Sequence, residues 1–546
     1  MAAIGSFCLV LHGHMPYVLH HGEWPHGEDW LYEATAETYL PLLSTIEECC
    51  YLNAHPQMTI GLTPVLLEQL AHEHFKQGFK TYLHSRIEQA TSDEQYFQKE
   101  GQPHLAWLAS HWIKFYKDLL KQYRGIDYDI PAAFKKLAEE GAVELLTSAA
   151  THGYMPLLLE DSSIRAQLRA GMNSSERILG LRPKGIWLPE GAYRPAGNWA
   201  PAIEWGHPDW RRGIDELVAE EALTHFFVDD HMFNYGSGID RQIIHQPVWV
   251  DGNGGRSPSM IAFARDPYIC KQVWCGFVGY PADGVYLEFH KRHGRRRGLR
   301  YWKITDRKSD LGSKQYYYPD DVPGKIYEQS QHFCREVKHQ LYEYQQQTGK
   351  KGVVVACFDA ELFGHWWFEG PAFLKNVLLT LDADADVELQ TAENYLKSHR
   401  PDQSVHLRAG SWGEGGDHRV WANEQLKWLW EIEYRCETLF GKLTYHLPWR
   451  TQPQLRDILQ KAGRELLLLQ ASDWPFVITR RQAPDYGIKR FIQHVDRFDM
   501  LTETAERLAE DPNYLRGLNP VKKLQMKEAD MRDVIFQNID LNWWNC

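Results

Sequence analysis

Several common signatures are missing from this chain of 546 residues, and each absence argues against a class of protein. The nine cysteines include no Cys-x-x-Cys spacing, so reduced thiols in a cytoplasm are expected rather than a zinc finger or a spaced disulfide framework. No stretch reaches the roughly 18 apolar residues that a membrane span needs. The apolar run at residues 4–11 has neither a cationic lead nor a small-residue cleavage site, which favours a first strand over a signal peptide. The sequence therefore predicts a soluble, cytoplasmic protein with no membrane partner.

An excess of basic residues is missing as well. The net charge is −12, whereas a surface that binds nucleic acid needs more lysine and arginine than acid. The one basic stretch, residues 293–300 with four arginines, is interpreted as a solvated loop. Aromatic residues, in contrast, are abundant: they make up 13% of the chain and include 21 tryptophans. Several lie in glycine-rich, charged segments, where flat rings beside polar groups suit a pyranose ligand.

Seven short apolar runs, each followed by polar residues, recur along the chain. They occupy residues 6–11, 58–62, 143–148, 184–188, 223–228, 260–264 and 352–357, with helical patterns at 33–50, 163–179 and 371–381. Apolar runs without alternation predict parallel strands that are buried on both faces. Polar residues at the carboxyl ends of such strands are typical of a (β/α) barrel, whose active site lies on that face. A doubly wound sheet would gather ligands similarly, but no glycine-rich phosphate loop follows the first run, so we favour the barrel.

Two regions do not follow this strand-and-helix rhythm. Residues 79–136, between the second and third predicted strands, are rich in Gln, Lys and aromatic residues and predict an inserted helical subdomain. Beyond the last strand, helical apolar spacing covers residues 423–445, 454–469 and 486–508. We therefore expect a catalytic barrel formed by residues 1–78 and 137–405, the insertion at 79–136, and a helical C-terminal domain at 406–546.

Two carboxyl residues stand directly after predicted strands, Glu190 after residues 184–188 and Asp359 after residues 352–357. A retaining glycosidase needs such a pair, one nucleophile and one acid/base, about 5–5.5 Å apart. The aromatic stretch 362–367 beside Asp359 should raise its pKa and keep it protonated as the acid. Arg194, near Glu190 in sequence, should favour an ionised nucleophile. The alternative is that either carboxylate forms a salt bridge at the barrel mouth.

His12 and His14 are two apart on an extended segment, so their side chains share one face. Such a pair at the end of a first barrel strand can bind a metal, and Asp229, Asp230 and His231 could complete the site. That interpretation would make the protein a metal-dependent deacetylase or amidohydrolase. The other interpretations are hydrogen-bond donors to sugar hydroxyls, or structural histidines.

Five ordered motifs together resemble those of glycoside hydrolase family 57. They are His-Gly-His-Met-Pro at 12–16, Thr-His-Gly at 151–153, Trp-Leu-Pro-Glu at 187–190, Phe-Asp-Ala-Glu-Leu-Phe-Gly-His-Trp-Trp at 358–367, and the segment 466–476 ending in Ser-Asp-Trp-Pro-Phe. The segment 410–421, Gly-Ser-Trp-Gly-Glu-Gly-Gly-Asp-His-Arg-Val-Trp, is most similar to the branching-enzyme subgroup of that family. The resemblance covers nearly the whole chain, and the combination of motifs is far more specific than any one of them.

The resemblance implies an α/β fold: a distorted (β/α)7 barrel with an inserted helical subdomain and an all-helical C-terminal domain that completes the cleft for the glucan. It implies a retaining 1,4-α-glucan branching enzyme that cleaves α-1,4 bonds of amylose, amylopectin or glycogen and transfers the chain to a 6-hydroxyl. Glu190 would be the nucleophile and Asp359 the acid/base, with no metal and no cofactor. The matching positions that would line the cleft are His12, His14, His152, Trp274, Trp412, Trp421 and Asp473.

Two further expectations concern aromatic residues. Trp412 and Trp421 lie in a polar, glycine-rich stretch, so with Trp274 they are expected to be stacking platforms for glucan rather than core residues. The segment 231–248 after the fifth strand looks shorter than the lid loop of the family's branching enzymes, and Tyr235 is its candidate lid residue. A short lid would admit water, so the alternative function is an α-glucan hydrolase or a 4-α-glucanotransferase with the same catalytic pair.

Overall fold

Seven strands form a ring at the centre of the computed structural model, which describes residues 3–206, 208–233, 241–252, 260–276, 279–294 and 297–545. In chain order they are β1 (Gly5–Gly13), β2 (Met58–Leu62), β3 (Val143–Leu146), β4 (Gly185–Ile186), β7 (His225–Asp229), β9 (Ile261–Arg265) and β10 (Gly352–Asp359). Every strand run expected from the sequence is among them, so the predicted barrel strands are confirmed.

Strand pairing follows chain order around the ring. β10 pairs with β1, β1 with β2 and β2 with β3, and β4, β7 and β9 pair in the same way, all in parallel. Two weaker links close the circle: a parallel bridge between Thr147 and Ile186, and a 2.8 Å hydrogen bond from the backbone N–H of Asp266 to the oxygen of Val355. The result is a seven-stranded barrel that is distorted where β4 is only two residues long.

Alternate residues of the strands point into the ring. Cys8 and Val10 of β1 meet Phe227, Phe263 and Val355 in one hydrophobic cluster inside it. The residues between them belong to larger clusters that include the surrounding helices. Because side chains alternate along a strand, the residues that continue the inward sets at the carboxyl ends project into the mouth of the barrel. His12 and Asp359 are two of these, and they are paired in the register of β1 and β10.

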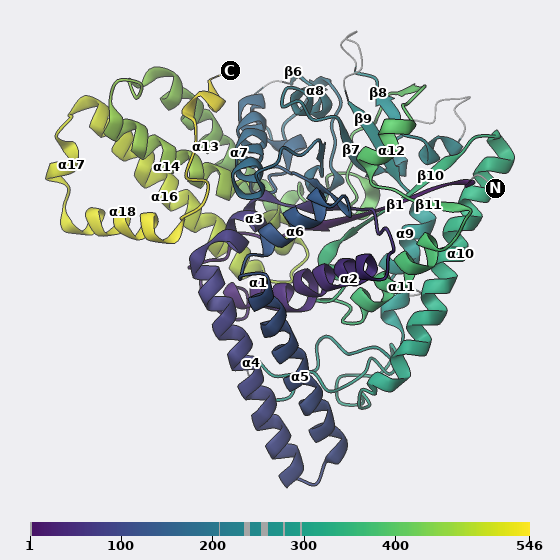
Figure 1. Cartoon of the computed structure of the whole chain (residues 1–546). Coiled ribbons are helices and arrows are strands. Elements are labelled where there is room, and N and C mark those ends of the chain that lie inside the picture. Colours follow the sequence, from purple (N-terminus) through teal and green to yellow (C-terminus); the bar gives the residue numbers. More distant parts are fainter. Residues whose placement is uncertain are drawn as a thin grey trace.

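Helices surround the barrel and extend from it (Figure 1). Those around the strands are α1 (Glu28–Ala34), α2 (Leu40–Tyr51), α3 (Pro64–Ala71), α6 (Ile130–Glu139), α7 (Asp161–Leu179), α8 (Ile214–Ala219), α9 (Pro267–Trp274), α10 (Val322–Thr348), α11 (Gly370–Asp382) and α12 (Ala392–Ser398). Short strands β8 (Val248–Val250), β11 (Val387–Leu389) and β12 (Ser404–Val405) widen the sheets. None of the described helices is both long and apolar enough to cross a membrane.

Two helical regions stand out in Figure 1. α4 (Glu73–Lys99) and α5 (Pro103–Gly125) form a long hairpin that projects from the barrel; it overlaps the insertion predicted at 79–136 but begins before it, at Glu73. The C-terminal part is helical, as predicted, and lies at the left of the view: α13 (Lys427–His446), α14 (Pro453–Leu469), α15 (Asp473–Thr479), α16 (Pro484–Glu510), α17 (Tyr514–Gly517) and α18 (Pro520–Arg532). The exact domain boundaries stay a prediction.

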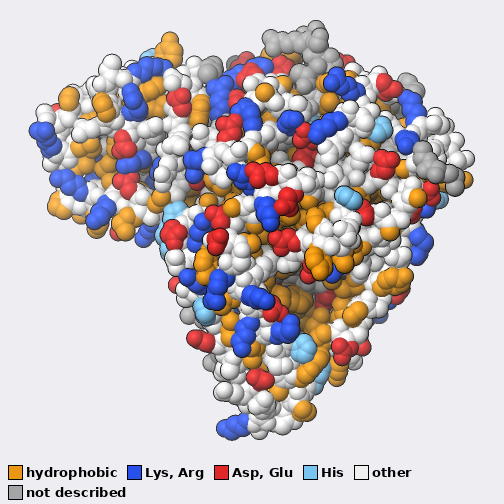
Figure 2. All heavy atoms as spheres, viewed as in Figure 1, with side chains coloured by type: hydrophobic (Ala, Val, Ile, Leu, Met, Phe, Trp, Pro, Cys, Tyr) orange, Lys and Arg blue, Asp and Glu red, His pale blue; other side chains and the backbone are white. Residues whose placement is uncertain are grey.

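Charge is mixed on the surface. Figure 2 shows basic and acidic side chains interspersed over the visible face, so the net charge of −12 is not gathered into one acidic patch there.

Candidate functional site

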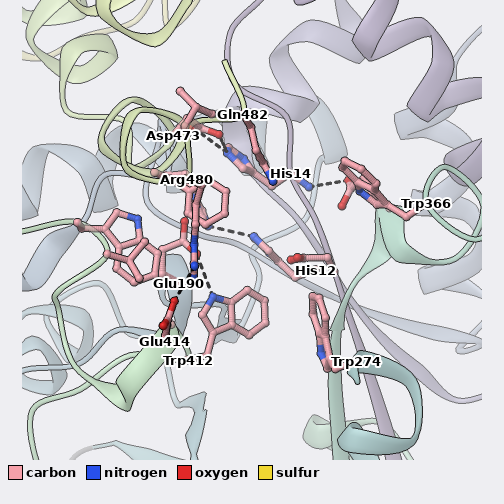
Figure 3. A pocket seen from close by; sticks show the side chains of 18 of the residues that line it. His12, His14, Glu190, Trp274, Trp366, Trp412, Glu414, Asp473, Arg480 and Gln482 are labelled. Atoms are coloured by element: carbon pink, nitrogen blue, oxygen red, sulfur yellow. Dashed lines mark hydrogen bonds and ion pairs between the residues drawn. The ribbon is translucent and has the colours of Figure 1, made fainter. Parts of the chain in front are cut away.

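A cavity of about 610 Å³ opens at the carboxyl ends of the barrel strands, where the helical C-terminal region meets the barrel (Figure 3). Every site residue expected from the sequence that lies among the described residues lines it: His12, His14, His152, Glu190, Trp274, Asp359, Trp412, Trp421 and Asp473. Tyr235, the expected lid residue, lies outside the described residues. The structure therefore brings together residues that are separated by up to several hundred positions in the chain.

Glu190 lies on a tight turn just after β4, at a positive φ of 60° that non-glycine residues rarely adopt. Its two carboxylate oxygens accept separate hydrogen bonds, from Trp412 Nε1 at 2.9 Å and from Ser472 Oγ at 3.0 Å. Burial raises the pKa of Glu190 to about 7, although both hydrogen bonds oppose the rise. Such strain at a buried, hydrogen-bonded carboxylate is typical of a functional position.

Arg194, the cation expected to favour ionised Glu190, makes its contacts with other residues. Arg194 donates a hydrogen bond to the backbone oxygen of Arg212 at 2.9 Å, and its guanidinium lies over the ring of Trp199. The positive charge that favours ionised Glu190 comes instead from His14.

Asp359 ends β10 and faces into the cavity. Burial raises its pKa well above the usual range, and the charges of Glu361 and Glu190 raise it further, while Arg265 opposes them. The raised pKa favours the protonated form of Asp359, the direction expected from its aromatic neighbours. The two carboxyl groups thus differ in their surroundings: two hydrogen bonds oppose the rise in the pKa of Glu190, whereas neighbouring carboxylates add to the rise in the pKa of Asp359.

Three histidines stack beside Glu190 and do not share one protonation state. His12 and His152 are joined through their Nε2 atoms at 3.0 Å, and burial holds both pKa values well below the usual range. His14 lies 3.0 Å from the Asp473 carboxylate. Burial alone would lower the pKa of His14, but the charge and hydrogen bond of Asp473 outweigh it and raise the pKa. The cavity wall therefore combines two imidazoles whose pKa values are lowered with one histidine–carboxylate pair in which the histidine pKa is raised.

Three residues of the site were not singled out from the sequence. Glu361 accepts hydrogen bonds from the backbone N–H of His14 at 2.9 Å and from the Tyr39 hydroxyl. Ser472 is the donor to Glu190, and Arg265 lines the cavity and pairs with Asp229 at 2.7 Å. Glu361 lies two positions after Asp359 and Ser472 directly before Asp473, so their places within the motifs were the available signal.

The residues that would complete a metal site with His12 and His14 make other contacts. Asp229 is paired with Arg265, and His231 Nε2 lies 2.9 Å from the backbone oxygen of Gly416. Within the described ranges, no group of three possible ligands whose atoms lie within 4.8 Å of one another includes His12 or His14. The structure thus does not assemble the ligand set that a deacetylase would need.

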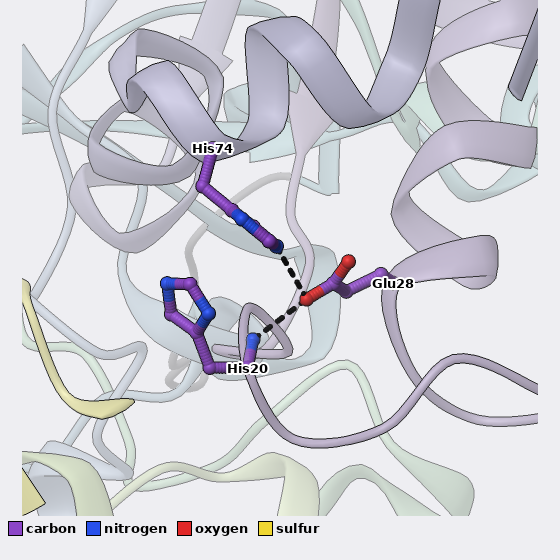
Figure 4. A group of neighbouring side chains, drawn as sticks. All are labelled: His20, Glu28 and His74. Carbon is purple, nitrogen blue, oxygen red and sulfur yellow. Dashed lines mark hydrogen bonds and ion pairs between the residues drawn. The ribbon is translucent and has the colours of Figure 1, made fainter. Parts of the chain in front are cut away.

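Two other groups of potential metal ligands lie outside the cavity. In the first, Glu28 Oε1 accepts from the backbone N–H of His20 at 2.8 Å and contacts His74 Nε2 at 2.9 Å (Figure 4), while Tyr32 donates to Oε2 at 3.0 Å. These hydrogen bonds account for both oxygens of the carboxylate. The second group, Glu465, His494 and Asp533, is fully buried between helices and is bonded to arginines.

The tryptophans divide into two kinds. Trp274 is 38% exposed, and Trp412 is half-buried with its ring 6.0 Å from that of Trp274. Trp421 is fully buried and stacks on Tyr154 at 4.6 Å, and its ring also lies 6.2 Å from that of Phe476. The expectation that Trp421 is not a core residue is therefore wrong. Its glycine-rich segment folds back onto the hydrophobic core of the C-terminal helices, a contact that local composition does not show.

Comparisons with known proteins identify families and relatives that this chain resembles. Residues 8–272 match the model of glycosyl hydrolase family 57, and residues 433–544 match that of the 1,4-α-glucan branching enzyme C-terminal domain. A 1,4-α-glucan branching enzyme of Thermococcus kodakarensis is 35% identical, and the match covers 97% of this chain and 78% of that protein. A probable 1,4-α-glucan branching enzyme of Mycobacterium tuberculosis is 30% identical over 94% of this chain and 96% of that protein.

Solved structures agree with the sequence comparisons. A GH57-type branching enzyme of the archaeon Pyrococcus horikoshii superposes with a TM-score of 0.90 at 37% identity, covering 99% of this chain and 97% of that one. An α-amylase of Thermotoga maritima superposes with a TM-score of 0.84 at 27% identity, covering 99% of both chains. The chain belongs to glycosyl hydrolase family 57, and its similarity is highest, among these relatives, to the branching enzymes of that family.

Proposed function

We propose that this protein is a retaining 1,4-α-glucan branching enzyme, with Glu190 as nucleophile and Asp359 as general acid/base. The observation that carries the proposal is the difference between the two carboxyl groups in one cavity. Glu190, held by Trp412 and Ser472, has a pKa of about 7, whereas burial and neighbouring charges keep the pKa of Asp359 well above its usual range. A pair whose pKa values are pushed apart is suited to separate nucleophile and acid roles.

The reaction follows from these protonation states. Ionised Glu190 attacks the anomeric carbon while the Asp359 O–H protonates the glycosidic oxygen, so the C–O bond breaks and a glycosyl ester forms on Glu190. Asp359, now a carboxylate, then takes the proton from the 6-hydroxyl of an acceptor glucan. The acceptor oxygen attacks the same anomeric carbon and releases Glu190. Two inversions leave an α-1,6 bond with the original anomeric configuration.

The histidines and Asp473 line the space next to both carboxyl groups. The paired His14 and Asp473 and the two other imidazoles offer donors and acceptors for the hydroxyls of the sugar at the point of cleavage. The exposed ring of Trp274 and the half-buried ring of Trp412 offer apolar faces for neighbouring sugars.

Hydrolysis of α-glucan is the second candidate function. It is supported by the similarity to an α-amylase, which covers 99% of both chains. Water and a sugar hydroxyl compete for the same glycosyl ester, so transfer dominates only where the site positions the acceptor and excludes water. One assay separates the two functions. With amylose as substrate, a branching enzyme forms more α-1,6 linkages than new reducing ends, and an amylase forms mainly reducing ends.

The catalytic assignment is tested by Glu190→Gln. Turnover should fall below about 1% of the wild type, because a general acid/base contribution alone is worth roughly 10²-fold and no other group can form the ester. Glu414→Gln is the matched control, since Glu414 lines the same cavity but pairs with Arg480 and should tolerate the change. If Glu190→Gln keeps more than a few per cent of activity with an unchanged melting temperature, Glu190 is not the nucleophile.

A further inference from the structure

A second cavity, of about 1040 Å³, lies on the outside of the barrel. Its walls are the N-terminal turns of α7, the two-stranded hairpin of β5 (Gly197–Trp199) and β6 (Asp209–Arg211), and the C-terminal half of α13. Figure 1 shows β6, α7, α13 and the C-terminus in one region of the molecule. Among the described residues, no side chain lines both this cavity and the catalytic one, so the second cavity is a separate site.

Tryptophan dominates the apolar part of its lining. Trp199, Trp205, Trp210 and Trp544 all line it. Trp210 is 59% exposed on the β5–β6 hairpin, a large apolar ring held in solvent by two short strands. Trp199 is fixed from behind, since the guanidinium of Arg211 lies 4.8 Å from its ring centre. Trp205 is fixed edge-on against Tyr434, with ring centres 5.9 Å apart. The hairpin therefore presents aromatic faces that are ordered before any ligand binds.

The rest of the lining is polar and carries both signs of charge. Glu160, Asp161 and Asp209 line it together with Arg165 and Lys442. A nucleic acid would need a basic excess, and a protein partner a larger apolar core, so this mixture fits neither well. Aromatic faces beside mixed donors and acceptors suit a sugar, whose ring has an apolar face and a hydroxylated rim. The volume of about 1040 Å³ slightly exceeds the roughly 300–1,000 Å³ of ligand sites, which allows several linked sugar units.

We infer that this cavity is a second, non-catalytic binding site for an α-glucan chain. The identity of the sugar rests on the proposed function, whereas the site itself rests on its own residues. A long glucan that is held here and in the catalytic cavity at once is bound by two linked sites, which raises its apparent affinity without any new contact at the carboxyl groups. Oligosaccharides too short to reach both cavities do not benefit. The enzyme thereby favours long polymeric chains over short ones.

Affinity for a long polymer tests the inference. In the full-length Glu190→Gln chain, retardation by amylopectin in native gels reports binding without turnover. Adding Trp210→Ala should weaken the apparent affinity by about tenfold or more, within the 10²–10⁴-fold gain that linked sites can give. Trp205→Ala should act in the same direction. Tyr327→Ala, which removes a ring that is 62% exposed on α10 and is not part of this cavity, should change nothing.

Activity supplies the second measurement. In the otherwise wild-type chain, Trp210→Ala should raise KM for amylopectin and leave kcat and KM for a short malto-oligosaccharide unchanged. Unchanged amylopectin affinity in both tryptophan variants overturns the second site and leaves the branching function standing. If the wild type neither binds nor converts any α-glucan, the proposed function fails instead, so the two failures are distinguishable.

Discussion

The indole N–H of Trp412 donates a hydrogen bond to the carboxylate of Glu190 and so favours its ionised form. Its hydrogen bond at 2.9 Å lowers the pKa of a carboxyl group that burial raises. Trp412→Phe keeps an aromatic ring and removes the donor. Since a hydrogen bond to a charged group contributes about 1.5–3 kcal/mol and one pKa unit corresponds to about 1.4 kcal/mol, the pKa should rise by about one unit or more. Only ionised Glu190 attacks, so the acid limb of the kcat/KM profile should move to higher pH.

Trp274→Phe is the control for that shift. Trp274 lines the same cavity, but its Nε1 faces the backbone oxygen of Cys357 at 3.4 Å rather than Glu190. Its substitution should leave the acid limb in place. An acid limb that stays fixed in Trp412→Phe would mean that another group sets the ionisation seen in the profile.

The buried ring of Trp421 makes a different prediction from that of an exposed platform. Removing a fully buried tryptophan costs about 3–5 kcal/mol, because the ring leaves a cavity that its neighbours cannot fill. Trp421→Ala should therefore lower the denaturant midpoint strongly, whereas Trp274→Ala, at a ring that is 38% exposed, should lower it little. Equal denaturant midpoints for the two variants would show that Trp421 is a surface platform for glucan and does not stabilise the core.

Sequence patterns located the two carboxyl groups that we propose as catalytic because each follows a recognisable strand, and strand ends converge in a barrel. They did not locate Ser472, which is 282 positions away from Glu190, or show that Trp421 packs into the core. Both depend on how the helical region docks on the barrel. The sequence around residues 410–421 is polar and glycine-rich. Trp421 is buried there only because the C-terminal helices pack against this segment.

At the scale of elements, the positions of the seven barrel strands were predicted from the sequence, whereas one long helix, α10, was missed. α10 buries Ile326, Phe333, Val337, Leu341 and Tyr344 along one face, a spacing close to 3.6 residues. The pattern was therefore present in the sequence. It is diluted by Gln, Glu and Lys on the other face and lies in a long interval between the sixth and seventh strands, where loops were equally plausible from composition.

α15 contacts the barrel through Asp473, which pairs with His14 after β1. The pair raises the pKa of His14, against burial. A raised histidine pKa contributes stability below its unfolded value of about 6.5, and that stability is lost as pH rises through the folded pKa. Asp473→Asn should thus lower the melting temperature more at about pH 6 than at about pH 9.

A pair of the same chemistry on the surface serves as control. His55 and Asp382 lie 3.6 Å apart with the histidine largely exposed, and exposed pairs contribute about 0–1 kcal/mol. Asp382→Asn should change the melting temperature little at either pH. If the effect of Asp473→Asn is the same at both pH values, the histidine is not protonated in the folded protein.

For the whole molecule, the functional unit spans both regions of the chain. The barrel supplies the two carboxyl residues and the histidines, and the C-terminal region supplies Trp412, Ser472 and Asp473. The backbone also crosses the boundary, since the N–H of Ser472 donates to the oxygen of His152 at 3.1 Å. Neither region alone forms the cavity, which explains why the family's motifs extend over nearly the full sequence.

A buried ionic network joins the same two regions away from the cavity. Asp533, after α18, contacts His21 of the barrel at 2.8 Å and pairs with Arg497 of α16, and it is fully buried. Removing one partner of a buried pair costs about 3–5 kcal/mol, because the other charge is left uncompensated. Asp533→Asn should therefore lower the melting temperature clearly. It should also reduce branching activity, since the loop that carries His21 begins with His14 and Met15 of the cavity.

The matched control is Asp530→Asn, because the carboxylate of Asp530 is 45% exposed and pairs with Lys461. This substitution should change neither the melting temperature nor the activity. Loss of stability without loss of activity, measured well below the melting temperature, would show that the network holds the regions together but does not shape the cavity.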